Sequence, residues 1–219
     1  MSQVRFIFDL DDTLYYERDY VLSGLNFVGA LIEKLYGVKH AGDALLNEFN
    51  AGNRDPIGLV CQQSGIVEST KLDIVYCMRG HHPEIEMPSE TSDFIQQLRS
   101  NSMPFGILTD GRSITQRSKL AALGLLDAAF ISISEEQGFG KPDRRCYEQF
   151  YQVFPNCDLI YVADNPKKDF HVPNRLNWTT IMLRDQGHNI HSQADISQND
   201  LRAKIVIDRF SELNSFLRG

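Results

Sequence analysis

Three aspartates follow an apolar segment close to the start of the chain. The stretch "RFIFDLDDTL" (5–14) contains Asp9, Asp11 and Asp12. Carboxylates this close repel one another, so a nearby positive charge is needed to make the crowding tolerable. Mg²⁺ suits such a site because it is a hard cation commonly held by one or two carboxylates together with the phosphate of a substrate. These residue types therefore indicate a divalent metal and chemistry on a phosphate.

Other polar residues end or follow apolar runs further along the chain. They are Thr109 and Asp110 in "PFGILTDG", Lys141 in "GFGKPD" and Asp164 in "DLIYVADN". In doubly wound folds, ligands gather where the carboxyl ends of the strands meet the loops that follow them. We therefore expect these side chains to converge with the aspartates at one edge of a sheet.

The elements that would position these residues alternate along the chain. Short apolar runs, rich in β-branched and aromatic residues, predict six strands over 4–8, 104–111, 128–134, 158–165, 179–184 and 204–208. Helical patterns lie between several of them, over 114–123, 144–153 and 167–176. Strands and helices that alternate in this way predict βαβ units and an α/β fold with a doubly wound parallel sheet.

One interval breaks the alternation. Residues 15–88 show helical patterns and no convincing strand, and the first of these patterns ends at Gly37, a suitable helix C-cap. We interpret 15–88 as an all-helical module inserted after the first strand. Residues 1–14 and 89–219 would then form the core domain. A polar segment at 185–200 is expected to be a loop.

The ordered set of motifs resembles the haloacid dehalogenase superfamily, whose phosphotransferase members carry DxDx[TV], a Thr or Ser at a strand end, a Lys and a closing acidic motif. In this chain they read "DLDDT" from Asp9, "ILTDG" with Thr109, "GKPD" with Lys141 and "VADNPKKD" with Asp164 and Asp169. All four occur in the family's order. The residue before the first closing acid is alanine here, where the family usually has glycine. The resemblance implies a Rossmann-like core with a helical cap.

The resemblance also implies roles for the aspartates. Asp9 would be the nucleophile that forms an aspartyl-phosphate, and Asp11 would protonate the leaving oxygen and later deprotonate water. Mg²⁺ would be held by Asp9, Asp164 and the backbone carbonyl of Asp11. Asp169 would be a supporting acid that orients Lys141 or metal-bound water. Asp12 completes a turn and stays outside the predicted site.

The remaining motif residues would handle the phosphate. Thr109 and the amides of Asp110 and Gly111 would hold the phosphoryl oxygens, and Lys141 would offset the charge between nucleophile and phosphate. The resemblance implies that the helical insert corresponds to the cap of the superfamily, which closes over the substrate and sets specificity. Arg54 is the predicted substrate-binding residue of this module. Tyr15, Tyr16 and Arg18, just after the first motif, are further specificity candidates.

Asp11 also discriminates among the reactions of the superfamily. Dehalogenases of the superfamily need no acid for the leaving group at this position. Its phosphonate-cleaving members form a Schiff base with a lysine of the cap, and no lysine of the insert in this chain has a recognisable context for that role. We therefore expect a Mg²⁺-dependent phosphatase acting on a small phosphorylated metabolite, such as a sugar phosphate or a nucleotide. A sugar phosphomutase and a catalytically silent binding or regulatory subunit remain as alternatives.

Composition limits the partners. The 219 residues carry a formal net charge of −7, which argues against a general nucleic-acid binder. No run approaches the roughly 18 apolar residues of a membrane span, and Met1 is not followed by the apolar stretch of a signal peptide. The four cysteines form no CxxC pair and are expected to be reduced thiols. We expect a cytoplasmic protein with no membrane partner, and the sequence leaves its oligomeric state open.

Overall fold

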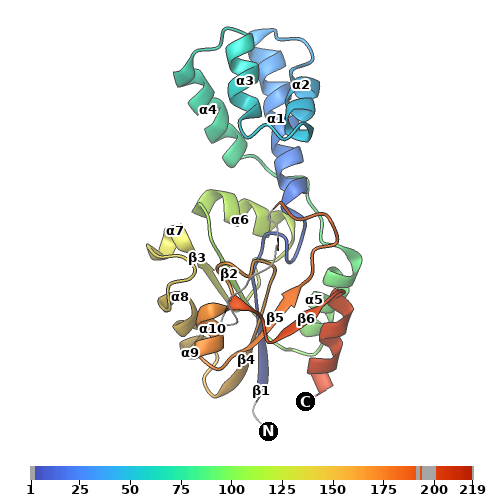
Figure 1. Cartoon of the computed structure of the whole chain (residues 1–219), viewed down its shortest axis with the longest axis vertical. Helices are drawn as coiled ribbons and strands as arrows, with labels where there is room; N and C mark the ends of the chain where they lie inside the picture. The colour runs from blue at the N-terminus through green and yellow to red at the C-terminus, as the bar shows by residue number, and fades with distance from the viewer. Residues whose placement is uncertain (1–2, 191–192, 194–200, 219) are drawn as a thin grey trace.

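A parallel sheet forms the centre of the molecule. The computed structural model describes residues 3–190, 193 and 201–218. Six parallel strands are ordered β3-β2-β1-β4-β5-β6 (Figure 1). They are β1 (Gln3–Phe8), β2 (Gly106–Thr109), β3 (Phe130–Ile133), β4 (Cys157–Ala163), β5 (Thr179–Leu183) and β6 (Ile205–Ile207). The predicted fold class is confirmed, and each predicted strand corresponds to one of these six.

In the described part of the chain, seven helices belong to the sheet domain. They are α5 (Ser89–Ser100), α6 (Ser113–Ala122), α7 (Ser134–Gln137), α8 (Arg145–Glu148), α9 (Phe150–Val153), α10 (His171–Arg175) and the 3₁₀ helix η2 (Phe210–Arg218). Residues 1, 2 and 219 of the predicted core and residues 191, 192 and 194–200 of the predicted loop lie outside the described residues.

The two faces of the sheet are covered by different helices because successive strand residues point to opposite sides. Phe6 and Phe8 of β1 pack edge-to-face with Phe94 of α5, in a cluster that also contains Phe210 of η2. The helices α5 and η2 lie side by side (Figure 1). Ile7, between them, belongs to a second cluster with residues of α8, α9 and α10. The sheet is therefore buried on both sides, which explains why its strands read as continuous apolar runs.

Two predicted helices differ from the structure. The pattern over 144–153 forms two short helices, α8 and α9, with Gln149 between them. The pattern over 167–176 becomes helical only at His171. The side chain of Asn165 accepts a hydrogen bond from the amide of Lys167 at 3.1 Å, and Asp169 accepts one from the amide of Asn165 at 3.2 Å. Such local side-chain bonds replace the hydrogen bonds of a helix, so this segment is a turn.

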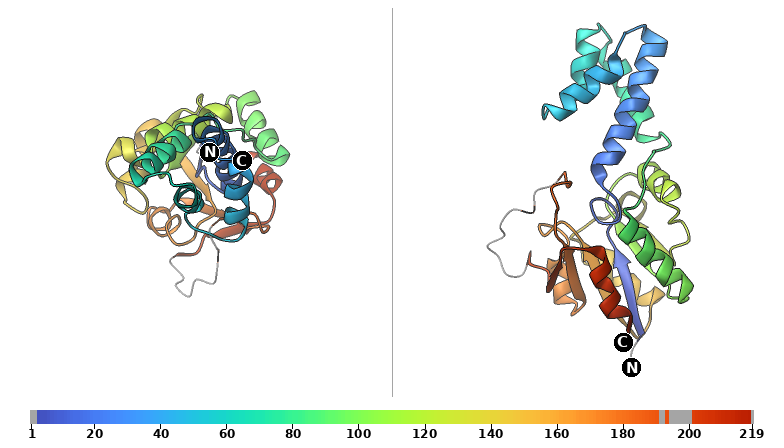
Figure 2. Two further views of the ribbon diagram at one scale, coloured as in Figure 1. Left: turned by 90° about the horizontal axis from the view of Figure 1, so that it is seen from above. Right: turned by 90° about the vertical axis from the view of Figure 1, so that its right-hand side faces the viewer.

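Four helices form a separate bundle with its own core. They are α1 (Glu17–Tyr36), α2 (Ala41–Asn50), α3 (Pro56–Gln63) and α4 (Glu68–Arg79), and they pack around residues such as Leu25, Val28 and Leu45. Figure 1 and Figure 2 show the bundle beyond the end of the sheet to which β1 runs, with α1 extending from that edge into the bundle. The carboxyl ends of the strands therefore face the bundle.

The close packing of α1 against α2 depends on a glycine. A Cβ atom on Gly29 of α1 would lie 2.4 Å from the Cα atom of Gly42 in α2, closer than real atoms approach. At the far end of α1, Gly37 adopts φ 68° and its amide donates to Glu33, as predicted for a C-cap. The helical interval predicted at 15–88 thus contains helices over 17–79, and its use as a cap domain stays a prediction.

No helix in the described part of the chain has the length and apolar character that a membrane span needs. All four cysteines are free thiols, with Cys61 and Cys146 buried. A cytoplasmic location and the absence of a nucleic-acid partner stay predictions from the sequence.

Candidate active site

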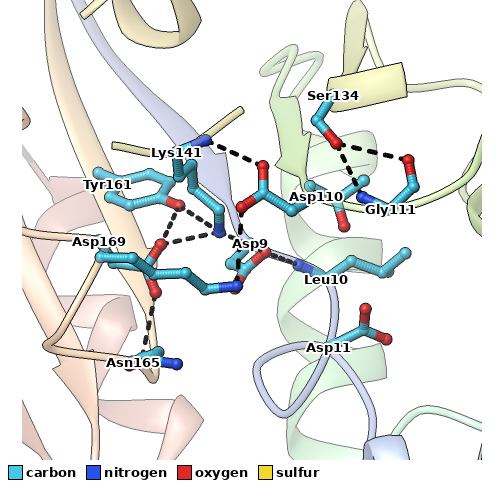
Figure 3. Close-up of polar contacts among 12 residues, drawn as sticks. Asp9, Leu10, Asp11, Asp110, Gly111, Ser134, Lys141, Tyr161, Asn165 and Asp169 are labelled. Carbon is cyan, nitrogen blue, oxygen red and sulfur yellow. Dashed lines mark hydrogen bonds and ion pairs between the residues drawn. The ribbon is translucent and has the colours of Figure 1, made fainter. Parts of the chain in front are cut away.

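Asp9 lies at the end of the central strand. Its amide continues the pairing of β1 with β4 by donating to the carbonyl of Val162 at 2.9 Å. Its side chain is buried, and Oδ1 accepts a hydrogen bond from the amide of Leu10 at 2.8 Å and lies 2.8 Å from Nζ of Lys141. Because both backbone and side chain are fixed, the carboxylate has a defined direction at the strand end (Figure 3).

Lys141 is fully enclosed by acidic and phenolic groups. Its Nζ lies 2.7 Å from Oδ1 of Asp169 and donates to the hydroxyl of Tyr161 at 3.2 Å, and that hydroxyl donates to Asp169 at 3.0 Å (Figure 3). Burial by itself would lower the pKa of Lys141, but the Asp169 and Asp9 carboxylates hold it well above its ordinary value. The lysine is therefore a fixed positive charge next to Asp9, and Asp169 orients it.

The residues predicted to hold a phosphate lie on the neighbouring strand end. Thr109 ends β2 and is buried, and Oδ1 of Asp110 accepts a hydrogen bond from the amide of Lys141 at 3.0 Å. Gly111 has φ 146°, and a Cβ atom there would lie 3.0 Å from the side chain of Gln116. The Gly111 amide donates to Oγ of Ser134 at 2.9 Å. A phosphoryl oxygen would have to share or replace this bond to use that amide.

Three carboxylates gather beside Lys141. Oxygens of Asp9, Asp164 and Asp169 all lie within 4.8 Å of one another, and all three residues are buried. Burial raises the pKa of Asp164 to about 8, and the neighbouring Asp9 and Asp169 carboxylates add to this rise. Burial likewise raises the pKa of Asp9, against the pull of Lys141. Lys141 thus faces three buried carboxylates, and this all-oxygen set fits a hard divalent cation such as Mg²⁺.

The side chain of Asp11 points away from this cluster. Figure 3 shows its carboxylate on the opposite side of Asp9 from Lys141 and Asp169. Nζ of Lys119 lies 2.6 Å from Oδ1, and Gln116 donates to Oδ2 at 3.0 Å. Burial would raise the pKa of Asp11, but the Lys119 ammonium and its hydrogen bonds bring it below its ordinary value. Only the backbone carbonyl of Asp11, and not its side chain, is predicted to bind Mg²⁺. The observed direction of the side chain is compatible with that prediction.

Asp12 stabilises the loop between β1 and α1. It has φ 53°, and its two carboxylate oxygens accept hydrogen bonds from the amides of Glu17 and Ile190, each at 2.9 Å. Asp12 therefore connects the start of α1 to the loop after β5, and it stays outside the candidate site.

The specificity candidates lie in different places. Tyr15 is buried and its hydroxyl donates to Oδ1 of Asp11. The ring of Tyr16 lies 4.6 Å from that of His188, and Arg18 donates to Asn50 at 2.8 Å, which connects the start of α1 with the end of α2. None of these three contacts, two hydrogen bonds and one ring contact, reaches the Asp9–Lys141 pair directly.

Arg54 is exposed in the loop between α2 and α3. The hydrogen bond between Arg18 and Asn50 places the end of α2 beside the start of α1. The loop over 51–55 therefore lies at the end of the bundle nearer the sheet (Figure 1). The structure does not bring Arg54 into the cluster around Asp9, and its predicted contact with a substrate stays a prediction.

Sequence reasoning missed four residues of the site. Gln116 and Lys119 bind Asp11, and Tyr161 binds Lys141 and Asp169. Nζ of Lys168 lies 3.8 Å from Oδ2 of Asp110, and its charge acts on Asp9. Gln116 and Lys119 are three residues apart in a predicted helix that follows "TDG", so they lie on the same face of that helix. This spacing could have identified them as a pair near the site. Nothing in the local sequence distinguishes Lys168 from its neighbour Lys167.

Known proteins share both the sequence pattern and the fold. The sequence model of a hydrolase family, described as haloacid dehalogenase-like hydrolase, matches residues 5–169. A glyceraldehyde 3-phosphate phosphatase of Methanopyrus kandleri is 26% identical over 193 residues, which cover 81% of this chain and 82% of that protein. A phosphoserine phosphatase of Thermus thermophilus is 34% identical over 121 residues, 52% of this chain and 47% of that protein.

Solved structures of two kinds are similar to the whole chain. The putative HAD-hydrolase YfnB of Bacillus subtilis, solved bound to magnesium, has a TM-score of 0.66 at 16% identity, with all of both chains covered. A 2-haloacid dehalogenase of Pseudomonas syringae has a TM-score of 0.61 at 18% identity, with 100% of this chain and 99% of that chain covered. Different reactions occur on one fold, so the reaction has to be inferred from the side chains of the site and not from the fold.

Proposed function

Because the chain belongs to the haloacid dehalogenase-like hydrolases, we propose that it is a Mg²⁺-dependent phosphatase that hydrolyses a small phosphorylated metabolite through an aspartyl-phosphate. The observation that carries the proposal is the pair of carboxylates two residues apart in different surroundings. Asp9 lies against Lys141 at 2.8 Å, and Asp11 lies against Lys119 at 2.6 Å on the other side. Two carboxylates with different environments suit two different roles.

In the first step Asp9 attacks phosphorus. A bond forms between a carboxylate oxygen of Asp9 and phosphorus, and the bond from phosphorus to the leaving oxygen breaks. Asp11, which Lys119 keeps ionised in the resting site, takes a proton from the monoanion of the bound phosphate monoester and passes it to that leaving oxygen. Lys141 keeps its charge beside Asp9, since Asp169 holds the ammonium at 2.7 Å, and it offsets the negative charge that the phosphoryl group brings.

In the second step water attacks phosphorus and the bond from phosphorus to Asp9 breaks, which frees the carboxylate and inorganic phosphate. Asp11 now takes a proton from the attacking water. Asp11 is ionised at this stage because it has given its proton to the leaving group, so it can accept this one. Mg²⁺, held by Asp9, Asp164 and the backbone carbonyl of Asp11 with Asp169 beside them, would neutralise charge on the phosphoryl oxygens.

The substrate side of the proposal is supported by the position of the bundle and by the relatives. The four-helix bundle stands over the strand ends that carry the site, where a cap can exclude water and select the leaving group (Figure 1). Two relatives are named as phosphatases of small metabolites, a triose phosphate and a phosphorylated amino acid. We propose a substrate of that size for this chain.

A phosphatase screen with matched variants tests the proposal. Sugar phosphates, triose phosphates, nucleotides and phosphorylated amino acids are assayed with Mg²⁺, with Ca²⁺ and after exhaustive EDTA treatment. We expect activity with Mg²⁺ and poor activity with Ca²⁺, whose looser coordination misplaces the nucleophile. Activity on para-nitrophenyl phosphate that survives EDTA treatment would contradict the metal requirement.

Two variants separate the roles of the carboxylates. Asp9→Asn removes the nucleophile and should abolish both steps. Asp11→Asn leaves Asp9 able to attack an aryl phosphate, whose leaving group needs little protonation, but slows hydrolysis of the intermediate by about 10²–10⁴-fold. Rapid-quench kinetics should therefore show a burst of aryl alcohol with phosphate trapped on the protein. Near-normal turnover by Asp9→Asn would show that the nucleophile is wrongly assigned. Transfer of the trapped phosphate to a sugar phosphate, with none released to water, would favour the phosphomutase.

A further inference from the structure

A second buried lysine lies across the site from Lys141. Lys119 is on α6, and its side chain is only 4% exposed. Its Nζ lies 2.6 Å from Oδ1 of Asp11 and 4.3 Å from the centre of the Tyr20 ring. An ammonium group removed from water is costly unless a carboxylate and polarisable groups surround it. The structure supplies both, so Lys119 is held in place by Asp11 and by the ring.

Gln116 lies one turn earlier on the same face of α6. Its amide nitrogen donates to Oδ2 of Asp11 at 3.0 Å and to Oγ1 of Thr109 at 2.6 Å. Gln116 is 1% exposed, so these bonds form away from bulk water. One side-chain amide thereby connects the residue proposed to hold the phosphoryl group with the residue proposed to move protons.

The two oxygens of Asp11 have different partners. Oδ1 lies against Lys119 and accepts the hydroxyl of Tyr15, whereas Oδ2 accepts the amide of Gln116. A carboxylate oxygen offers about two lone-pair positions. Within the described part of the chain, Oδ1 uses both of its positions and Oδ2 uses one. Oδ2, which Gln116 holds beside Thr109, is therefore the oxygen that can still take and give a proton.

We propose that Lys119 and Gln116 are positioning residues for the proton transfers of this enzyme, and that Oδ2 of Asp11 is the atom that carries the proton. Lys119 and Tyr15 fix Oδ1, and Gln116 sets the distance between Oδ2 and the phosphoryl site at Thr109. In this role both act through Asp11 and not by direct contact with the substrate. The inference rests on the proposed function, because it assigns partners to the acid–base group of that reaction.

A double-mutant cycle tests whether Lys119 acts through Asp11. Lys119→Met keeps the length of the side chain and removes its charge and donors. Since a small displacement of a catalytic group can cost about 10²-fold, we expect kcat on an alkyl phosphate to fall by about that factor, with KM changed less than about threefold. The loss should be smaller on an aryl phosphate. In the Asp11→Asn background, Lys119→Met should cause no further loss of kcat.

Further variants control for folding and charge. Lys119→Arg should recover part of the lost kcat, because it restores a cation beside Oδ1. Gln116→Met gives a second, independent cycle with Asp11→Asn if Lys119→Met fails to fold. Arg117→Met serves as the matched control, because Arg117 is on the same helix but pairs with Glu136 at the surface, at 2.8 Å. It should leave kcat and KM unchanged.

The outcomes separate this inference from the proposed function. Near-normal turnover by Asp9→Asn would overturn the proposed function itself. If Asp9→Asn and Asp11→Asn are impaired but Lys119→Met and Gln116→Met behave as the unchanged enzyme, only the positioning role is overturned. Losses that multiply in the Asp11→Asn background would also overturn it, because the two residues would then act independently of Asp11.

Discussion

Lys167 and Lys168 are neighbours in the sequence but differ in their relation to the nucleophile. Lys167 is exposed, while Lys168 is half-buried with Nζ 3.8 Å from Oδ2 of Asp110. The positive charge of Lys168 also opposes the rise in the pKa of Asp9. A cation at this place can meet a phosphoryl oxygen that arrives between Asp9 and Asp110.

We therefore predict that Lys168→Ala raises KM for a phosphate monoester and weakens inhibition by inorganic phosphate. The change in each should be about tenfold, the size expected for the loss of one charge-assisted hydrogen bond. Lys167→Ala is the matched control and should change either constant less than twofold. Steady-state kinetics with phosphate as inhibitor measure both. Equal effects from the two variants would mean that only the net charge of the loop matters.

At the scale of elements, the contact of α1 with α2 sets the shape of the bundle. A Cβ atom on Gly29 would overlap the Cα atom of Gly42, whereas a Cβ atom on Gly42 would meet nothing within 4 Å. We predict that Gly29→Ala lowers the free energy of unfolding by about 1–3 kcal/mol, the usual cost of overpacking. Gly42→Ala should be neutral or stabilising, because alanine favours a helix by about 1 kcal/mol over glycine. Urea unfolding of the two variants measures the difference, and equal stabilities would contradict the close contact.

The loop between α2 and α3 carries the other prediction at this scale. If the bundle closes over the substrate, Arg54 at its sheet-facing end should contact the leaving group. Arg54→Ala should then raise KM for the natural substrate several-fold and leave turnover of para-nitrophenyl phosphate nearly unchanged. Lys39, exposed in the loop at the opposite end of the bundle, provides the control variant Lys39→Ala. Equal losses on both substrates would indicate a folding defect in place of a specificity role.

At the scale of the whole molecule, the buried carboxylates connect stability to pH and to metal. Asp164 has its pKa raised to about 8 by burial and by the neighbouring carboxylates. Between about pH 4 and pH 8 the unfolded chain has lost this proton while the folded, metal-free protein keeps it. Stability therefore falls as pH rises through this window, by up to about 1.4 kcal/mol per pH unit from this group.

We predict that saturating Mg²⁺ reverses this loss, because a cation stabilises the ionised carboxylates of the folded state only. Unfolding by urea at pH 5, 6, 7 and 8, in EDTA and in Mg²⁺, measures the effect. Asp164→Asn should flatten the dependence on pH in EDTA and weaken the stabilisation by Mg²⁺. A slope in EDTA that is the same for both proteins would show that Asp164 does not carry the proton.

Local sequence patterns were enough to identify the strands, the helical interval and the polar residues at the strand ends. Buried parallel strands read as short apolar runs, and a polar residue that ends or directly follows such a run lies at the carboxyl end of the strand. Asp9, Thr109 and Asp164 could therefore be identified from local order, and Lys141 from its motif. The helical interval was equally readable, because amphipathic periodicity is a property of the helix itself.

The pairing of side chains from distant parts of the chain depends on how the elements pack. Lys119 lies 108 residues from Asp11 along the chain, and their ion pair depends on how α6 packs on the sheet, which no local spacing encodes. Lys168 differs from Lys167 only because the turn after Asp164 directs one of them inward. The turn also replaced the first part of a predicted helix, since the side chains of Asn165 and Asp169 bind backbone amides that helix bonds would otherwise use. Long-range packing sets these choices, and it exists only once the whole chain has folded.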